Sequence, residues 1–496
     1  MAYKLLSSHF GSENISKFDD VYYDCSVHAV YARDYAISSG ISFIKAQPYG
    51  PSTIRNAPFC LFPSPFPKKL FLKAQGLQRF ISRIQNRCAL HPTFLIEELE
   101  QTAKHDDFCK RLLDIHVKVL ASSTAQKLHL GILRSDYMIQ AKTTDIDAIS
   151  LEDASEFTLK QIEVNTMASS FGSLANSVRN FHRHFLNKLG CHGDLPSNSS
   201  LEAISNGIAL AHKEYCNQTG ACSPSVLFVA KADEQNIVDH RRIEFHLFDQ
   251  HRINVVRLSL TEIGARGSLD EETGIFTIDG TEISIAYFRT GYDPEHYPTE
   301  VEWKARELLE LSQTIKCPSI AYQLSGLKKI QQVLSEPAVL ERFLNDHDAI
   351  SELRSTFATQ VSLQFNSESD HAIANALSNP EGYVLKPQRE GGGNNFFDDA
   401  LVNELNRIKD LEEKQSYILM ERIHPPAVNN YIITEPPVAQ LVPTICELGI
   451  FGVILASDKV ELFNETEGHL LRTKPVKKAD GGVAAGNACL DSPLLF

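Results

Sequence analysis

Hydrophobic and polar positions along the middle of the chain follow first the period of strands and then that of helices. Short apolar runs predict strands at 225–230, 254–260, 274–278 and 282–288. The last two flank Asp279-Gly280, a pair typical of a two-residue hairpin turn. Thr299, followed three residues later by Glu302, has the pattern of a helix N-cap. We therefore predict a compact α/β unit over residues 224–328.

The last third of the chain is rich in strand patterns and in glycine. Buried strands are predicted at 383–385, 417–420 and 449–455, and helices over 300–350 and 398–415. Two glycine-rich loops lie between and after these strands, at 391–393 and 481–486. The first 160 residues are mixed and mostly helical in pattern, and residues 191–206 resemble a linker. The whole pattern is typical of the α/β or α+β class.

Composition and charge narrow the class of protein. The 496 residues are 43% hydrophobic and 22% charged, as in ordinary globular proteins, and no apolar run approaches the ~18 residues that span a bilayer. The net charge of 48 − 62 = −14 argues against nucleic acid as the main partner, because phosphate binding needs a basic face. The ten cysteines form no Cys-x-x-Cys pair, and the start lacks the apolar stretch of a signal peptide. We expect a cytoplasmic protein that binds neither nucleic acid nor membrane.

The segment KPQREGGGNN (386–395) is the most informative loop. Glycines without a Cβ let the backbone approach a ligand and direct N–H groups at anionic oxygens. Lys386 and Arg389 add positive charge, and the carboxylate of Glu390 suits a hard cation. The loop matches neither the P-loop nor the Rossmann pattern. From its residues alone it is either a phosphate-binding loop or a flexible surface turn.

The segment QIEVNT (161–166) carries a possible metal site. Strand alternation places Glu163 and Asn165 on one face, opposite Ile162 and Val164. A carboxylate and an amide oxygen suit Mg²⁺, with phosphate oxygens and water as further ligands. Taken alone, the pattern is more typical of a solvated strand face.

Three other segments carry groups suited to an anionic nucleotide or substrate. Residues 417–423 form a strand-like run that offers backbone groups to a flat base, or is simply a core strand. Arg472 and Lys474 precede the second glycine loop, which could cover an anionic ligand. Arg289 follows a predicted strand, where α/β proteins tend to place ligand groups. Together these segments favour ATP- and Mg²⁺-dependent chemistry on an anionic metabolite.

At these residues the sequence resembles the eukaryotic-type glutathione synthetases, a family of ATP-grasp ligases. The resemblance spans nearly the whole chain, in LFPSPFPKKLF (61–71), RSDYM (134–138), QIEVNTMASSFGSL (161–174), YFRTGYDP (287–294), KCPSIAYQLSGLKKIQQ (316–332), VLKPQREGGGNN (384–395), YILMERI (417–423), ELGIFGV (447–453) and LLRTKPVKKADGGVAAG (470–486). It implies an α/β (α+β) ATP-grasp fold with an inserted α/β substrate-binding domain and glycine-rich lid loops. The implied division is an N-terminal part of the framework (1–223), the substrate-binding domain (224–328), and a C-terminal part with the glycine loops and lid (329–496).

The resemblance also implies an activity and a set of site residues. The family joins γ-glutamylcysteine to glycine with ATP and Mg²⁺, through an acyl phosphate, and releases ADP and phosphate. The resemblance also implies a homodimer. The implied catalytic residues are Arg134, Lys386 and Arg472, and the implied Mg²⁺ ligands are Glu163, Asn165 and Glu390. The implied ATP contacts are Glu163, Lys328, Lys386, Gly391, Gly392, Gly393, Asn394, Asn395, Phe397, Met420, Glu421, Arg422, Ile423, Glu447 and Lys474. The implied substrate contacts are Arg134, Ala168, Ser169, Ser170, Phe171, Glu234, Asn236, His240, Arg289, Thr290, Gly291, Tyr292, Arg472, Val483 and Ala484.

Four residues depart from the usual family pattern and bear on substrate affinity more than on reaction type. They are Ala168 in place of Ser, His240 in place of Gln, Thr290 in place of an acidic residue and Phe397 in place of Tyr. The pair Ala484-Ala485 favours glycine as the incoming amino acid, since β-alanine-using relatives carry another pair there. The alternatives are a homoglutathione-type ligase using β-alanine or another small amino acid, a catalytically silent ATP-binding module on the same fold, and an ATP-dependent kinase.

Overall fold

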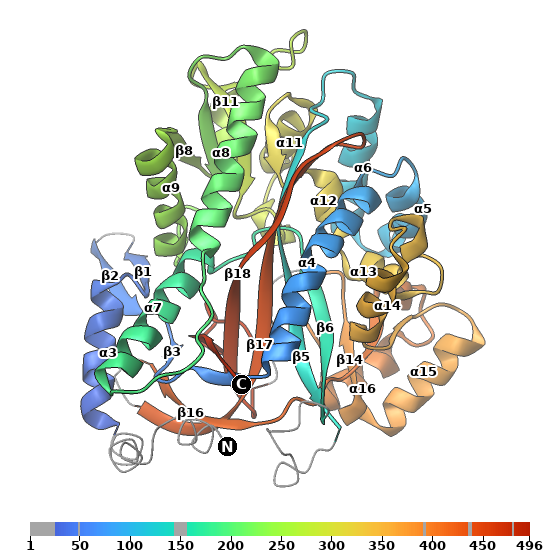
Figure 1. The fold of residues 1–496 in the computed structure, drawn as a ribbon. Helices are drawn as coiled ribbons and strands as arrows, with labels where there is room; N and C mark the ends of the chain where they lie inside the picture. The colour runs from blue at the N-terminus through green and yellow to red at the C-terminus, as the bar shows by residue number, and fades with distance from the viewer. Residues whose placement is uncertain (1–24, 48–49, 143–155, 390–392, 435–438, 479–480) are drawn as a thin grey trace.

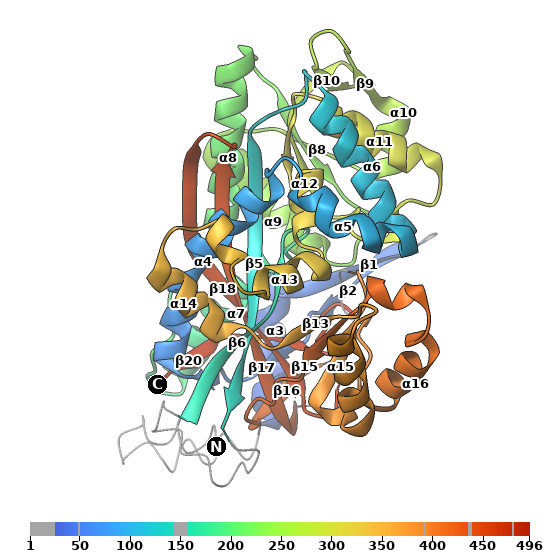
Figure 2. The same ribbon diagram turned by 90° about the vertical axis from the view of Figure 1, so that its right-hand side faces the viewer.

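The structure is a computed structural model that describes residues 25–47, 50–142, 156–389, 393–434, 439–478 and 481–496 (Figures 1 and 2). Helices and mixed sheets alternate along the chain, in agreement with the predicted α/β class. None of the described helices is long and apolar enough to cross a membrane.

A seven-stranded, mostly antiparallel sheet forms the centre of the molecule. In spatial order its strands are β16 (Val428–Ile433), β3 (Phe59–Cys60), β19 (Cys489–Asp491), β18 (Glu461–Pro475), β17 (Ala439–Ala456), β5 (His129–Ala141) and β6 (Phe157–Asn165). Among the described strands of this sheet, β19 and β3 alone pair in parallel. Strand β6 lies at the edge of this sheet, next to β5.

Both faces of the long strand β17 are buried over residues 448–456. Leu448, Ile450 and Ile454 pack in one core cluster with helix α4 (Lys68–Ala89). Phe451, Val453 and Leu455 pack in the other cluster, with helices α7 (Gly172–Lys188) and α8 (Ser200–Thr219). Figure 1 shows α4 to one side of β17 and β18, and α7 and α8 to the other. Burial on both faces explains the continuous apolar run that predicts a strand at 449–455.

A second sheet lies at the top of Figure 1 and is built from the middle of the chain. Its parallel strands are β8 (Val255–Leu258), β7 (Ser225–Val229), β11 (Thr281–Phe288) and β12 (Ile315–Cys317), and the antiparallel strands β10 (Phe276–Ile278) and β9 (Gly267–Leu269) extend it beyond β11. Helices α9 (Ile237–His251), α10 (Leu260–Arg266) and α11 (Glu300–Leu311) belong to the same segment.

The predicted local signals of this segment are present. Asp279 and Gly280 form the turn between β10 and β11 with φ angles of 49° and 80°. Thr299 caps α11, and Glu302 completes the capping box. Strand β11 ends at Phe288, so Arg289 follows the carboxyl end of a parallel strand.

A third, antiparallel sheet consists of β13 (Gln360–Ser362), β15 (Ile418–Glu421) and β14 (Tyr383–Lys386). Helices α15 (Ser367–Ser378) and α16 (Asp398–Ile408) pack on it, and Figure 2 shows this unit beside the lower part of the central sheet.

The remaining elements are α3 (Ser26–Ser38), β1 (Ser42–Gln47), β2 (Gly50–Asn56), β4 (Ser64–Phe66), α5 (Phe94–His105), α6 (Asp107–Ala121), α12 (Ile320–Ser325), α13 (Lys328–Ser335), α14 (His347–Thr356), β20 (Pro493–Leu495) and the short 3-10 helices η3 (Pro294–His296), η4 (Leu340–Arg342), η5 (Pro380–Gly382) and η6 (Glu412–Ser416).

Two predictions about local structure are wrong in part. Helix α8 begins at Ser200, inside the segment that resembles a linker, because Ser200 is fully buried and its N–H donates to the side-chain oxygen of Asn198. The predicted helical stretch 300–350 is interrupted by strand β12. This segment forms a strand because it pairs with β11, and such tertiary pairing outweighs the local preference for helix.

Candidate active site

A cavity of about 380 Å³ opens where β5, β6, β17 and β18 of the central sheet face the third sheet. Many of the predicted site residues line it: Arg134, Glu163, Asn165, Ala168, Ser169, Ser170, Phe171, Tyr292, Lys386, Asn395, Phe397, Met420, Glu421, Arg422, Ile423, Glu447, Arg472, Lys474, Val483 and Ala484. Other predicted residues do not line it: Lys328, Gly393, Asn394, Glu234, Asn236, His240, Arg289, Thr290 and Gly291. Glu390, Gly391 and Gly392 lie outside the described residues.

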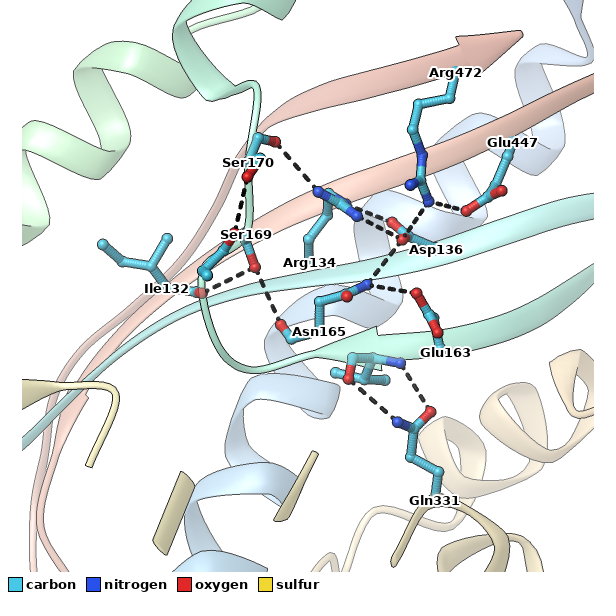
Figure 3. Close-up of polar contacts among 12 residues, drawn as sticks. Ile132, Arg134, Asp136, Glu163, Asn165, Ser169, Ser170, Gln331, Glu447 and Arg472 are labelled. Carbon is cyan, nitrogen blue, oxygen red and sulfur yellow. Dashed lines mark hydrogen bonds and ion pairs between the residues drawn. The ribbon is translucent and has the colours of Figure 1, made fainter. Parts of the chain in front are cut away.

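The carboxylate of Asp136 joins three of the lining residues (Figure 3). It has no exposed surface and accepts hydrogen bonds from Arg134 Nε at 2.7 Å and Arg134 Nη2 at 2.8 Å. It also accepts from Asn165 Nδ2 and from Arg472 Nη2, each at 2.8 Å. Such charge-assisted bonds are roughly twice as strong as neutral ones. One buried carboxylate therefore fixes side chains from β5, β6 and β18.

Asp136 is absent from the predicted site residues. Strand alternation was a signal that could have identified it, because Asp136 is two residues beyond Arg134 on β5 and so shares its face. Its partners on β6 and β18 are far away in sequence, and their approach is visible only in the folded chain.

Glu163 is held in its charged form by nearby cations. Its carboxylate lies 3.0 Å from Lys328 Nζ on α13. Burial alone would raise the pKa of Glu163, but Lys328, Lys386 and Arg472 together lower the pKa well below its usual range. Lys328 thus interacts with the site through its ion pair with Glu163, although it does not line the cavity.

Glu447 and Arg472 form a buried ion pair across β17 and β18, whose register places them opposite each other. Burial raises the pKa of Glu447, and Asp136 and Glu163 raise it further against the opposing effect of Arg472. Burial disfavours the charged form of Arg472, but Glu447, Asp136 and Glu163 outweigh this effect and raise its pKa. The guanidinium thus stays charged inside a ring of carboxylates.

Asn165 orients its side chain between the two acids. Its amide nitrogen donates to Asp136 and, at 3.2 Å, to Glu163 Oε1. These bonds identify which end of the amide is the carbonyl, a hard oxygen donor of the kind that Mg²⁺ accepts. Glu163 and Asn165 thus have the donor chemistry for Mg²⁺. In the described parts of the chain no group of three or more His, Cys, Asp or Glu is arranged to hold a metal by itself.

The loop between β6 and α7 shapes one wall of the cavity. Ala168 and Phe171 adopt left-handed φ angles of 51° and 70°. Asp239 on α9 accepts hydrogen bonds from the backbone N–H groups of Phe171 at 2.8 Å and Ser173 at 2.9 Å, which caps the start of α7. The carbonyl of Ser170 in turn accepts from Arg134 at 3.2 Å. A buried carboxylate thus stabilises a turn that few side chains adopt without cost.

Arg289 lies immediately behind this loop. It is only 3% exposed, donates to Ser169 O at 2.8 Å and to Ser170 Oγ at 2.7 Å, and contacts His240 at 3.1 Å. Burial, together with Arg289 and Arg257, lowers the pKa of His240 well below its usual value, so the ring is neutral. His240 thus contacts Arg289 directly.

Other predicted substrate contacts surround Arg289. Glu234 accepts from the backbone N–H of Asn236 at 2.8 Å, and Thr290 is buried. Gly291 has a φ of 96°, and a Cβ there would lie 2.8 Å from Tyr297 Oη, which explains the glycine. Of this strand-end segment, Tyr292 reaches the cavity wall.

The third sheet contributes an apolar slot. Val384 and Met420 are buried in one small cluster, and Phe397 and Ile423 pack against it. The Arg422 guanidinium lies over the Phe397 ring, 5.4 Å from its centroid. A slot between apolar side chains and an aromatic ring suits a flat base.

Positive charge reaches the cavity from β14. Lys386 is 3% exposed and its Nζ donates to Ile162 O at 3.2 Å, so β14 and β6 meet at this side chain. Gly481 of the second glycine loop lies close to Glu447, because a Cβ on Gly481 would be 3.4 Å from Glu447 Oε2. The cavity is further lined by residues that were not predicted as contacts, namely Met138, Ile162, Met167, Val384, Ile445, Val476, Lys478, Gly481, Gly482 and Ala485.

The chain is similar to known proteins along nearly its whole length. Residues 27–495 match the family described as eukaryotic glutathione synthase, ATP binding domain. The glutathione synthetase of Xenopus laevis is 41% identical over 486 residues, which are 96% of this chain and 99% of that protein. The Homo sapiens glutathione synthetase is 43% identical over 467 residues, or 93% and 95% of the two chains.

A solved structure shows the same fold. A glutathione synthetase-like effector from Globodera pallida, in its apo form, superposes with a TM-score of 0.74 at 21% identity and covers 95% of this chain and 97% of that one. The predicted α/β ATP-grasp fold class is therefore confirmed. The chain belongs to the eukaryotic glutathione synthase family of ATP-dependent ligases.

Proposed function

We propose that this ligase makes glutathione by activating the C-terminal carboxylate of γ-glutamylcysteine with ATP and then joining it to glycine. A carboxylate is a poor electrophile, and transfer of the terminal phosphoryl group of ATP would convert it into an acyl phosphate. The amine of glycine then attacks the carbonyl carbon, and phosphate leaves. One observation supports this reaction above others: a single cavity brings the cations Lys386 and Arg472 together with Glu163 and Asn165.

Glu163 and Asn165 would hold Mg²⁺ together with Glu390. When bound, Mg²⁺ supplies positive charge that offsets the negative charge of the transferring phosphoryl group. The lowered pKa of Glu163 supports this assignment, because a metal ligand must be deprotonated at neutral pH.

Lys386, Arg134 and Arg472 supply the fixed positive charge of the site. Lys386 would face the transferred phosphoryl group from β14, since preorganised cations stabilise charge that develops there. Arg134 or Arg472 would stabilise the oxyanion formed when the amine attacks. Both arginines are already oriented by Asp136, so little reorganisation is needed during the reaction.

The nucleotide and the peptide would occupy opposite ends of the cavity. The apolar slot beside Phe397, Met420 and Ile423 suits the adenine base. Tyr292, Ser170 and the buried Arg289 behind them suit the charged groups of γ-glutamylcysteine. The glycine loops would close over the site and exclude water, which would hydrolyse an acyl phosphate.

Glycine is the proposed amine because Ala484 and Ala485 both line the cavity. A difference of one methylene in a pocket contributes only ~1–3 kcal/mol of discrimination. β-Alanine and serine should therefore be used slowly rather than rejected. The predicted homodimer and cytoplasmic location remain predictions from the sequence.

The test is ADP release by purified protein with ATP, Mg²⁺ and γ-glutamylcysteine, with and without glycine, β-alanine or serine. We expect glycine-dependent ADP release in a one-to-one ratio with tripeptide. A preference for β-alanine would keep the ligase reaction and overturn the Ala484-Ala485 assignment. Amine-independent release of a stable phosphorylated product would favour a kinase, and no turnover by folded protein would favour a silent ATP-binding module.

A further inference from the structure

Strand β6 carries Glu163 and Asn165 at the edge of the central sheet. The order of that sheet places β5 on one side of β6. Among the described residues, the backbone pairing on its other side is limited to one isolated bridge, from Gln161 to Phe357. An unpaired edge leaves backbone N–H and C=O groups without ladder partners. Side chains take that role here, and one of them is Lys386, which donates to Ile162 O.

Gln331 of helix α13 makes the most complete of these contacts (Figure 3). Its Oε1 accepts from the backbone N–H of Val164 at 2.9 Å, and its Nε2 donates to Val164 O at 3.3 Å. The same Nε2 donates to Gly326 O at 2.6 Å. An amide side chain has both a donor and an acceptor, so it can bind both backbone groups of one strand residue as a neighbouring strand would.

Val164 separates the two predicted metal ligands. Because side chains alternate along a strand, the Val164 side chain is buried while those of Glu163 and Asn165 point together to the cavity. Hydrogen bonds to both backbone groups of Val164 restrain the strand at the point between these two side chains. The bond to Gly326 joins the same amide to the turn before α13, so strand and helix are held in one register.

Helix α13 also carries Lys328, whose Nζ lies 3.0 Å from Glu163. The amide of Gln331 and the charge of Lys328 thus reach β6 from one short helix. A shift of α13 along β6 would move the cation away from the carboxylate. The Gln331 bonds oppose this shift.

We infer that Gln331 is a positioning residue: its amide completes the edge of β6 and holds Glu163 and Asn165 in place for the Mg²⁺–ATP complex. This inference rests on the proposed function only for the metal role of those two residues. The restraint on β6 is a property of the protein without ligands.

Gln332 provides a matched control on the same helix. It is 3% exposed, and its amide contacts Lys329 at 2.9 Å and Glu336 at 2.7 Å, both within its own segment and neither on β6. Gln331→Met and Gln332→Met therefore make the same chemical change in α13, and only the first removes bonds to β6.

The first measurement is hydrogen–deuterium exchange of the full-length protein without ligands. In Gln331→Met we expect the peptide covering 161–166 to exchange about tenfold faster, as loss of a backbone-protecting hydrogen bond allows. We expect no change there in Gln332→Met. Unchanged exchange in Gln331→Met, or an equal change in both variants, overturns the inference.

The second measurement is steady-state kinetics. For Gln331→Met we expect the half-saturating Mg²⁺ concentration with ATP to rise about tenfold, while the KM for γ-glutamylcysteine changes less than about twofold. Equal rises in the half-saturating Mg²⁺ concentration and in the KM for γ-glutamylcysteine would indicate a general structural defect and contradict a positioning role. Absence of glycine-dependent turnover in the wild-type protein would instead overturn the proposed function, and the exchange result would still decide the role of Gln331.

Gln331→Glu keeps the inference testable if the Met variant does not fold. Its carboxylate retains an acceptor for the Val164 N–H and loses the donor to both carbonyls. The Val164 N–H should stay protected. The bonds to Val164 O and Gly326 O that tie β6 to α13 are lost, so the half-saturating Mg²⁺ concentration should still rise. A Mg²⁺ dependence identical to that of the wild-type protein would overturn the inference.

Discussion

The carboxylate oxygen Oδ2 of Asp136 lies 2.8 Å from a guanidinium nitrogen of Arg472, inside a site where Asp136 has no exposed surface. The same oxygen accepts from Asn165, and Arg134 binds both oxygens. Removing one partner of a buried, hydrogen-bonded charge leaves the others uncompensated, which is costly. The orientation of two proposed catalytic arginines and one proposed metal ligand therefore depends on one side chain.

Asp136→Asn should abolish most activity without unfolding the protein. An asparagine presents an N–H group to donors that need an acceptor, so at least one arginine loses its orientation. Charge-assisted bonds contribute ~1.5–3 kcal/mol each, so we expect kcat/KM for γ-glutamylcysteine to fall at least about 100-fold. Steady-state kinetics measure this change, with Asp458→Asn in an exposed turn as the matched control. Near-wild-type kcat/KM in Asp136→Asn would contradict the central role of this carboxylate.

Removal of the Lys328 charge should move the acidic limb of the pH–rate profile. Burial raises the pKa of Glu163, and Lys328 is the first of the cations that lower it, followed by Lys386 and Arg472. In Lys328→Met the pKa of Glu163 therefore rises, and the deprotonated form is lost at a higher pH. We expect the acidic limb of kcat/KM for ATP to shift to higher pH, whatever the loss in absolute rate.

The matched variant for this prediction is Lys328→Arg, which keeps the positive charge. Its acidic limb should stay close to that of the wild-type protein. Because Lys328 is itself a predicted ATP contact, both variants can lose rate, and the position of the limb is the informative quantity. Identical limbs in Lys328→Met and the wild-type protein would show that Glu163 does not control this part of the profile.

Local sequence signals account for much of the fold. The Asp279-Gly280 turn and the Thr299 cap need only neighbouring residues, and the structure contains both. Strand alternation also places Glu163 and Asn165 together, and their side chains lie 3.2 Å apart. These features depend on φ preferences and on side-chain periods, which a short segment determines by itself.

Features that depend on distant partners could not be predicted in this way. Ile315–Cys317 is a strand because β11 offers it a parallel partner, although its flanks are helical. Ser200 begins a helix because that position is buried against the carbonyl of Gly172. Asp136 gains its importance from Arg472 on β18, which is 336 positions away. The resemblance to a family supplied most of the candidate contacts, and it did not include this carboxylate.

The stability of the protein should depend on pH through Asp491 on β19. Burial raises the pKa of this carboxyl from 3.8 to about 6, although Ser64 and Thr473 donate hydrogen bonds that lower it. The folded state therefore binds this proton more tightly than the unfolded state. The resulting stabilisation is fully present below pH ~4 and is lost as pH rises through about 6, with a maximum of about 3 kcal/mol.

Asp491→Asn should remove this contribution. The amide keeps an oxygen for the backbone N–H of Ser492, and the hydroxyl groups of Ser64 and Thr473 can rotate to accept from its NH₂. We expect the gain in urea midpoint between pH 7.5 and pH 5 to be smaller in the variant than in the wild-type protein. Parallel pH dependences for the two proteins would assign the effect to other groups.

Gly326 should be essential for the shape of the β6–α7 loop. It lies in the turn before α13 with an ordinary right-handed backbone, so an added side chain causes no φ strain. A Cβ there would nevertheless lie 2.2 Å from Thr166 Oγ1, and Thr166 directly follows Asn165 and is only 4% exposed. Gly326→Ala must therefore displace Thr166 or α13. We expect a loss of ~1–3 kcal/mol of stability and a raised requirement for Mg²⁺.

Gly76 in helix α4 is the matched control, because an added side chain there meets no neighbouring atom. A Cβ at this position would have no atom within 4 Å, and its φ is not left-handed. Gly76→Ala should thus stabilise the protein by roughly 0.5–1 kcal/mol, because alanine loses less backbone entropy in a helix. Thermal midpoints and Mg²⁺ titrations of both variants test the pair. If Gly326→Ala matched Gly76→Ala in stability and Mg²⁺ dependence, the close contact with Thr166 would not constrain the site. The loop after β6 would then tolerate a displacement of Thr166, which its burial argues against.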